Sequence, residues 1–203
     1  MSGWEKYFEK IVCEKNTGID KDLYPFMYYF DYESCYVKSP IIYVYRNKKA
    51  TELENNLPMP PTDSFENMFY DCNSISNIDG LKNWDTSNVK NMSYMFDNCA
   101  SLLNVDGLKN WNTSNVIDMS YMFYDCDSLL NVDGLKNWNT KNVIDMTHMF
   151  DGCESLLNID NLKYWDTRNV VDMRYMFDGC YSLTSYPDNL RELRELPNKQ
   201  KNI

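Results

Sequence analysis

Apolar residues recur along this chain with a fixed period of 27 residues. In the block NVKNMSYMFDNCASL, at 88–102, valine, methionine, the Met-Phe pair, cysteine and leucine stand mostly three positions apart. The block returns at 115–129, 142–156 and 169–183 without insertion or deletion. Such a period predicts stacked structural units, each of which buries its apolar residues against its neighbours.

The length of the unit indicates what kind of coil it forms. Repeats built from pairs of helices need more than about 30 residues, whereas leucine-rich coils of a strand and a short helix need about 20–29. We therefore predict a strand near Asn91–Ser93, a short helical turn over Tyr94–Asn98, a second strand near Leu102–Asp106 and a return loop over Gly107–Asn115. Successive strands should stack in parallel about 4.8 Å apart.

The ends of such a stack expose apolar core and need caps. We predict an N-terminal α/β cap or small domain at 1–61, a solenoid of about five coils at 62–187, and a C-terminal cap helix with a tail at 188–203. In the first cap, PFMYYFDY and IIYVYRN are typical of strands, and LPMPPTD is typical of a linker. The residues expected to form a helical apolar face there are Trp4, Tyr7, Phe8, Ile11 and Val12. The C-terminal helix should carry Leu190, Leu193 and Leu196 and end at Pro197.

The repeated letters resemble a known family. The stretch SLLNVDGLKNWNTSNVIDMSYMF, followed by YDC, is similar to the repeat of BspA-like leucine-rich-repeat proteins, which is shared with mycoplasma surface lipoproteins. The resemblance covers about residues 62–187. It implies a curved solenoid of parallel strands that binds other macromolecules, often at a cell surface.

Charge favours one kind of partner. The formal net charge is −10, and residues 65–190 hold 18 acidic and 8 basic residues. Such a surface repels nucleic-acid phosphates and suits a basic partner. The sequence contains no run of about 18 apolar residues, so no membrane span is predicted. The start, MSGWEKYFEKIV, is unlike a signal peptide. These features predict a cytoplasmic chain, whereas the resemblance implies a surface location.

The cysteine column is expected to line the core. It comprises Cys72, Cys99, Cys126, Cys153 and Cys180. Zinc sites need clustered ligands and catalytic cysteines need a partner histidine, and this chain has neither a CxxC motif nor a second histidine. We predict free, reduced, buried thiols. The roles of Cys13 and Cys35 stay open.

Methionine and asparagine form further columns with structural interpretations. The methionines at 92, 119, 146 and 173 match the buried positions, so core packing is favoured over a metal-binding array. The asparagines at 88, 115, 142 and 169 are expected to form a buried ladder that bonds backbone groups of neighbouring coils. No cofactor or metal is predicted.

Two columns are candidates for partner binding. The first consists of Asp118, Asp145 and Asp172, which should point outward, with Arg174 nearby. The second consists of Tyr94, Tyr121, His148 and Tyr175. The aspartates either bond turn amides or form a negative face for a basic partner. The aromatic residues either pack half-buried against neighbouring coils or form a contact surface.

The sequence therefore predicts a non-enzymatic protein-binding module that engages a basic protein through its repeat surface. Two readings of that module stay open: an intracellular inhibitor or immunity-type protein, and a surface adhesion module. A third hypothesis places an enzyme in residues 1–61, but no Ser/His/Asp set, Gly-rich phosphate loop or HExxH motif is present.

Overall fold

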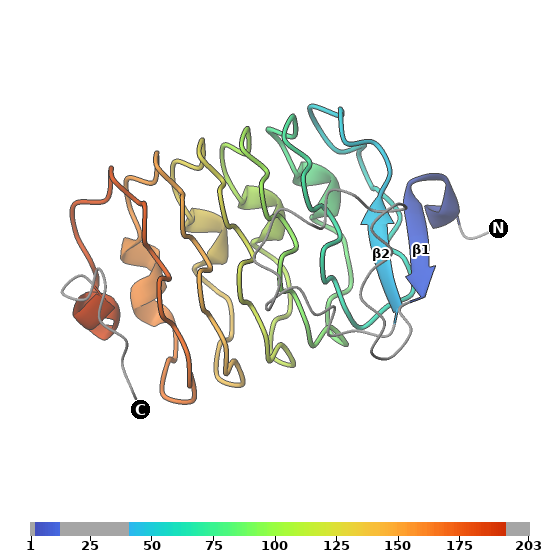
Figure 1. Ribbon diagram of the computed structural model, residues 1–203. Coiled ribbons are helices and arrows are strands. Elements are labelled where there is room, and N and C mark those ends of the chain that lie inside the picture. The colour runs from blue at the N-terminus through green and yellow to red at the C-terminus, as the bar shows by residue number, and fades with distance from the viewer. Residues whose placement is uncertain (1–2, 13–40, 194–203) are drawn as a thin grey trace.

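The chain winds into coils that follow one another along one axis, so that residues 27 apart lie in columns (Figure 1). The structure, a computed structural model, describes residues 3–12 and 41–193. The predicted strand at 25–32, the residues Leu196 and Pro197, and both N-terminal cysteines lie outside the described residues. The described elements are the strands β1 (Phe8–Val12) and β2 (Ile41–Tyr45) and the 3-10 helices η1 (Trp4–Lys6), η3 (Asp79–Leu81), η4 (Asp106–Leu108), η5 (Asp133–Leu135), η6 (Asp160–Tyr164) and η7 (Asp188–Leu193).

A backbone ladder joins the coils on one side. The amide of Met92 donates to the carbonyl of Asp118 at 2.9 Å, and the amide of Asn98 donates to the carbonyl of Tyr124 at 2.7 Å. Parallel bridges connect Asn91, Asp118, Asp145 and Asp172 in order. Equivalent residues thus pair as in a parallel sheet, as predicted, although each coil contributes a single bridge here and not a three-residue strand.

The predicted helical turn over Tyr94–Asn98 was wrong. Tyr94 and Asn98 both have a φ of 57°, in the left-handed region that a right-handed helix excludes. The amide of Tyr94 donates to the carbonyl of Ser120 in the next coil at 3.0 Å. A helix would need such donors for its own carbonyls, so the bonds between coils replace it with a series of turns.

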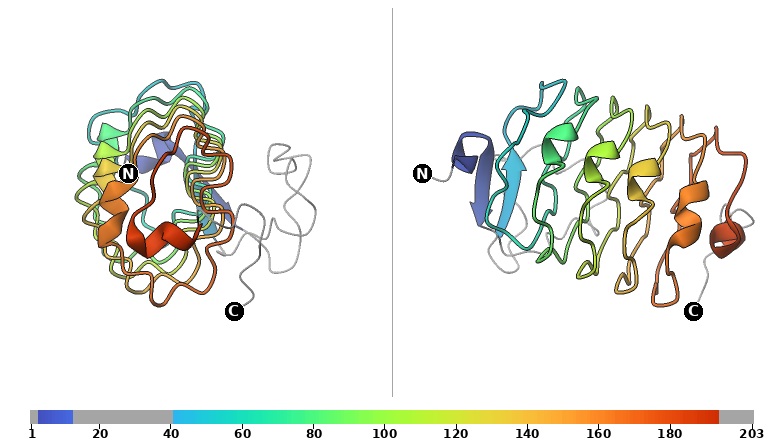
Figure 2. Two further views of the ribbon diagram at one scale, coloured as in Figure 1. Left: turned by 90° about the vertical axis from the view of Figure 1, so that its left-hand side faces the viewer. Right: turned by 180° about the vertical axis from the view of Figure 1, so that it is seen from behind.

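Short helices form instead within the predicted return loop. The elements η3 to η6 superpose along one side of the stack when it is viewed end-on (Figure 2). The predicted second strand near Leu102–Asp106 was wrong: in this column the described pairing consists of two isolated bridges, Glu52 with Asn77 and Asn131 with Asn158. The predicted repeat solenoid is therefore confirmed, but the repeats contain isolated bridges in place of the predicted strands, and the described helices are all of the 3-10 type.

The predicted core columns are buried. In the third cysteine-bearing coil the fully buried residues are Val116, Met119, Met122, Phe123, Cys126, Leu129, Val132 and Leu135. The phenylalanine rings of successive coils stack with centroids 5.3–5.5 Å apart, and the tryptophan rings stack at 6.1–6.4 Å. Sulfur and aromatic side chains thus fill the interior of the coil, which confirms the core reading for Met92, Met119 and Met146, whereas Met173 in the last coil is half-buried.

The five described cysteines are free and buried, as predicted. Each thiol from Cys99 onward donates to a phenylalanine carbonyl of the preceding coil, as Cys126 does to Phe96 at 3.2 Å. Burial raises the pKa of the Cys126 thiol well above its usual value. The pKa is raised likewise at Cys99, Cys153 and Cys180, so these four sulfur atoms pack as neutral, unreactive groups.

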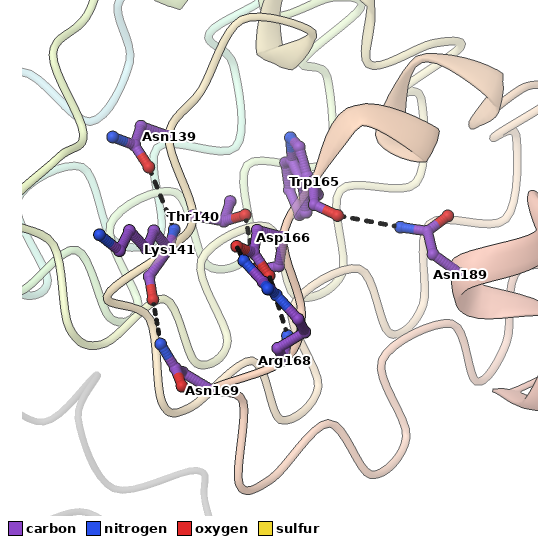
Figure 3. Close-up of polar contacts among 8 residues, drawn as sticks. All are labelled: Asn139, Thr140, Lys141, Trp165, Asp166, Arg168, Asn169 and Asn189. Carbon is purple, nitrogen blue, oxygen red and sulfur yellow. Dashed lines mark hydrogen bonds and ion pairs between the residues drawn. The ribbon is translucent and has the colours of Figure 1, made fainter.

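The Trp-x-Thr-x-Asn loop is held by polar contacts between coils (Figure 3). The side-chain amide of Asn169 donates to the carbonyl of Lys141 at 2.7 Å. Asn115 and Asn142 make the same bond to a carbonyl 28 residues earlier. The predicted asparagine ladder is therefore confirmed, but its members are exposed and not buried.

The N-terminal end of the stack is covered by the antiparallel pair β1–β2, in which Phe8 lies opposite Tyr45. The strand β2 lies within the predicted segment IIYVYRN. The helix predicted from Trp4 to Val12 was wrong, since only Trp4–Lys6 is helical. Pairing with β2 places the Phe8 ring 5.9 Å from that of Phe69 in the first coil, so a strand buries this side chain.

Two donors complete the edge of the first coil, whose carbonyls have no earlier coil to bond. The amide of Tyr45 donates to the carbonyl of Met68 at 2.7 Å, and the ammonium group of Lys48 donates to the carbonyl of Tyr70. Lys48 is half-buried. Its ammonium group thus takes the place of a missing backbone amide.

We expect the substitution Lys48→Met to lower the free energy of unfolding by about 2 kcal/mol, because a charge-assisted hydrogen bond to a buried carbonyl is lost. The measurement is urea unfolding followed by circular dichroism. Lys49→Met, at the exposed neighbouring position, is the control and should change stability by less than about 0.5 kcal/mol. Equal unfolding of the two variants would contradict the capping role.

At the C-terminal end of the stack, a side chain likewise supplies hydrogen bonds that a further coil would make. The indole N–H groups of Trp111, Trp138 and Trp165 each donate to a leucine carbonyl 30 residues earlier, as Trp165 does to Leu135 at 3.1 Å. The side-chain amide of Asn189, on η7, donates to the carbonyl of Leu162 at 3.1 Å and to that of Trp165 at 3.3 Å (Figure 3). A short helix therefore lies where the cap was predicted, and Asn189 substitutes for the next tryptophan.

Candidate partner-binding face

Each coil has one half that is acidic and another half that carries lysine and arginine residues. We call residues 91–102, and their equivalents at 118–129, 145–156 and 172–183, the tyrosine face. Within these four segments Arg174 is the only lysine or arginine. The acidic residues there are Asp97, Asp118, Asp125, Asp127, Asp145, Asp151, Glu154, Asp172 and Asp178. The return segments at 76–90, 103–117, 130–144 and 157–171 each carry lysine or arginine, so the negative charge is concentrated on one side.

The predicted aromatic column forms a continuous stack on this face. The rings of Tyr94 and Tyr121 have centroids 4.6 Å apart, those of Tyr121 and His148 4.5 Å, and those of His148 and Tyr175 4.7 Å. The first three members are half-buried, and Tyr175 is 38% exposed at the end of the stack. The structure thus brings the whole column together with its ring edges toward solvent.

This stack has a fixed backbone conformation. All four residues have φ between 53° and 59°, which is unusual for an aromatic side chain. The His148 Nδ1 atom also lies 2.7 Å from an oxygen of Asp151. Ring stacking and the ladder of amide bonds compensate for the backbone cost, so the aromatic residues are held rigidly.

The aspartate column closes turns. One oxygen of Asp118 accepts hydrogen bonds from the amide and the hydroxyl of Ser120, at 3.0 and 2.7 Å. Asp145 does the same with Thr147, at 3.0 and 2.6 Å. Both carboxylates are half-buried. This geometry favours the turn-forming role that the sequence left open for them.

Arg174 is engaged by the last member of that column. Its Nε and Nη2 atoms donate to the two oxygens of Asp172 at 3.0 and 2.6 Å. Burial opposes the ionisation of Asp172, but the hydrogen bonds and charge of Arg174 outweigh it and lower the pKa of this carboxyl. The only fully charged cation of the tyrosine face is therefore neutralised within the face.

Beside the stack lies a second set of carboxylates that the sequence analysis did not select. Burial, followed by the charges of Asp127, Asp151 and Glu154, raises the pKa of Asp125 to about 6. A Cβ atom on Gly152 of the next coil would lie 2.1 Å from an Asp125 oxygen. The Asp125 carboxylate thus lies close to the backbone of the neighbouring coil and is surrounded by other acidic side chains.

One acidic residue lies inside the stack. Asp97 is 0% exposed, and neither carboxyl oxygen has a hydrogen-bond partner. Burial, followed by the charges of Asp125 and Asp71, raises the pKa of Asp97 well above its usual range. Its repeat equivalents are tyrosines at 70 and 124 and aspartates at 151 and 178, so the repeat pattern does not single Asp97 out.

Sequence reasoning also missed two exposed apolar columns. Leu103, Leu130 and Leu157 are between 43% and 58% exposed, and Ile117, Ile144 and Val171 are between 42% and 67% exposed. Their backbones belong to the ladder, as Leu130 donates to Leu103 at 3.1 Å and Ile144 donates to Ile117 at 2.9 Å. Repeated apolar side chains in solvent are typical of interaction surfaces. The signal in the sequence is the second leucine of SLLNV and the isoleucine of NVID.

The part of the chain that the structure describes contains neither a metal-binding cluster nor a helix that could span a membrane. No group of three histidine, cysteine, aspartate or glutamate side chains is placed to hold a metal ion among residues 3–12 and 41–193. In the same ranges, no helix has the length and apolar character needed to span a bilayer.

Comparison with known proteins bears on the family. The family model described as "Mycoplasma protein of unknown function, DUF285" matches residues 63–190, which agrees with the mycoplasma repeat resemblance seen in the sequence. No curated protein matches significantly. Among solved structures, a leucine-rich-repeat protein of T. pallidum (TpLRR) matches with a TM-score of 0.34 and 19% identity, over 79% of this chain and 89% of that one.

Proposed function

We propose a function on the premise that this chain belongs to the mycoplasma family DUF285: it is a non-enzymatic protein-binding module that holds a basic partner on its tyrosine face. The family description states no function, so the proposal depends on the surface itself. The observation that carries it is the segregation of charge. Acidic residues gather around a rigid aromatic stack, and the only arginine there is already paired with Asp172.

The physical properties of this face suit recognition of a protein. Stacked aromatic residues offer a large contact area and lose little conformational entropy on binding, because they are already fixed. The uncompensated carboxylates around Asp125 attract a basic partner and steer its approach. Because Asp118 and Asp145 hold turns and Asp151 is engaged by His148, the carboxylates available to a partner are those at Asp125, Asp127 and Glu154.

We expect the double substitution Tyr121→Ser/Tyr175→Ser to weaken partner binding at least about tenfold, the usual cost of losing aromatic hot spots. The measurement is affinity capture from the native cell by the full chain, followed by titration of the captured protein. The matched control is Lys109→Ser/Lys136→Ser, two exposed residues of the return segments, and it should bind like the wild type.

The salt dependence of partner binding is a second test of the proposed function. Binding to an acidic face should weaken steeply as ionic strength rises, because the Debye length shortens from about 10 Å at 0.1 M to about 3 Å at 1 M. The proposal fails if the captured protein is acidic, if its binding is insensitive to salt, or if the tyrosine variant captures it as well as the control does.

A further inference from the structure

The exposed leucine column has acidic residues on both sides. Leu130 stands three residues after Asp127 and three residues before Asp133, and all three side chains are exposed. Leu157 is placed in the same way between Glu154 and Asp160. Leu103 differs only in having Ala100 on one side, with Asp106 on the other. The result is an apolar strip, Leu103–Leu130–Leu157, between two rows of carboxylates.

The spacing of this strip matches one kind of secondary structure. The amide of Leu157 donates to the carbonyl of Leu130, and that of Leu130 to Leu103, both at 3.1 Å. Parallel strands bonded in this way lie about 4.8 Å apart, so the three leucines span about 10 Å. An α-helix rises 5.4 Å per turn, so two turns span about 11 Å. In an extended strand, the side chains on one face are about 6.6 Å apart, so their spacing does not match that of the three leucines.

We infer that the leucine strip binds an amphipathic α-helix of a partner protein, laid along the stack axis, with one apolar residue per turn and lysine or arginine on both flanks. The inference rests on the proposed function, since it names the element that a basic partner presents. Apolar contact with the strip supplies the affinity, and the two carboxylate rows select the charge of the helix.

A second copy of this chain fits the strip poorly. The longest helix among the described residues is η7, with six residues, which is shorter than two α-helical turns. The net charge of −10 also opposes the association of two copies of this chain. A basic helix from another protein satisfies both the spacing and the charge.

The test uses the full chain and two synthetic 15-residue helical peptides of identical composition. In the first peptide the leucines form one stripe flanked by lysines, and in the second they are spread around the helix. Fluorescence anisotropy should show the striped peptide binding at least about tenfold more tightly than the scrambled one. Equal binding of the two peptides would overturn the inference, because it would reduce the attraction to charge alone.

Substitutions locate the site. The variant Leu103→Ser/Leu130→Ser/Leu157→Ser should lose at least about tenfold in affinity for the striped peptide. The matched control Ile117→Ser/Ile144→Ser/Val171→Ser changes the other exposed column and should bind within about twofold of the wild type. Urea unfolding checks that both variants fold, which is expected because the buried leucines at 102, 129 and 156 are retained.

The outcomes separate this inference from the proposed function. If the striped peptide fails to bind, or binds the leucine variant as well as the wild type, while Tyr121→Ser/Tyr175→Ser still loses its captured protein, only the inference on the leucine strip is wrong. If the tyrosine variant captures its partner normally, the proposed function is wrong, and the peptide titration still decides whether the strip binds a basic helix.

Discussion

Replacing Asp97 by asparagine is expected to stabilise the protein at neutral pH by about 3 kcal/mol, the order of the penalty for a buried charged group without a partner. The carboxyl group is fully buried and neither oxygen is hydrogen bonded. Asparagine has the same shape and carries no charge at any pH. The variant therefore removes the cost of either ionising this group or holding its proton.

The effect should depend on pH in one direction. In the unfolded chain an aspartate has a pKa of about 3.9, whereas burial and the charges of Asp125 and Asp71 raise the pKa of Asp97 in the folded chain. The folded state thus binds more protons than the unfolded state. The contribution of Asp97 to stability is fully present below the unfolded pKa and is lost as pH rises toward the folded one.

Urea unfolding at several pH values measures this difference. The stability gap between Asp97→Asn and the wild type should be small near pH 4 and widen as pH rises, over the range above an ordinary aspartate pKa of about 3.9. Asp85→Asn is the control, because hydrogen bonds from Ser87 lower the pKa of Asp85 and its contribution is lost as pH falls. A gap for Asp97→Asn that stays constant across the range would contradict the buried-carboxyl account.

Asp97 also shows where sequence reasoning fails. The period of 27 predicted the coil, the column of every core residue from Val116 to Leu129 and the free thiols, because packing between equivalent residues constrains all copies alike. A column that mixes residue types gives no such signal. The column of Asp97 holds tyrosine at 70 and 124 and aspartate at 151 and 178, and only the structure shows that the Asp97 side chain is fully buried.

Local geometry within the coil was less predictable for a related reason. The segment Tyr94–Asn98 has the composition of a helical turn, but its alternate amides, those of Tyr94, Phe96 and Asn98, donate to carbonyls of the next coil. Residues 4–12 likewise show helical spacing, although their pairing with β2 makes most of them a strand. In both places a partner distant in sequence decides the structure, and tertiary bonds override local propensity.

The candidate face was predicted in part. The aromatic column could be identified because its members recur at one position, and the structure stacks them as neighbours. The aspartate column could be identified too, but its bonds to Ser120 and Thr147 depend on a turn that the sequence pattern did not specify. The leucine strip was missed because a second leucine beside a buried one looks like core until the direction of each side chain is known.

The substitution Gly134→Ala is expected to destabilise the protein by about 3 kcal/mol, the upper end of the usual cost of overpacking a rigid site. A Cβ atom there would lie 2.1 Å from the carbonyl oxygen of Val105 and 2.6 Å from its carbon. Both are backbone atoms of the preceding coil, so no side-chain rotation relieves the clash. The loss should appear as a lower urea midpoint with an unchanged slope.

The same column supplies the control for this prediction. Asn161 occupies the equivalent position in η6 and already has a Cβ atom, so Asn161→Ala should cost only its surface hydrogen bond to Asp133, about 1 kcal/mol. If Gly134→Ala unfolds at the wild-type midpoint, the coils can separate at η5 and the close approach does not constrain them. If it unfolds early, the Asp-Gly-Leu turn sets how closely successive coils stack, and glycine recurs there for lack of space and not for turn conformation.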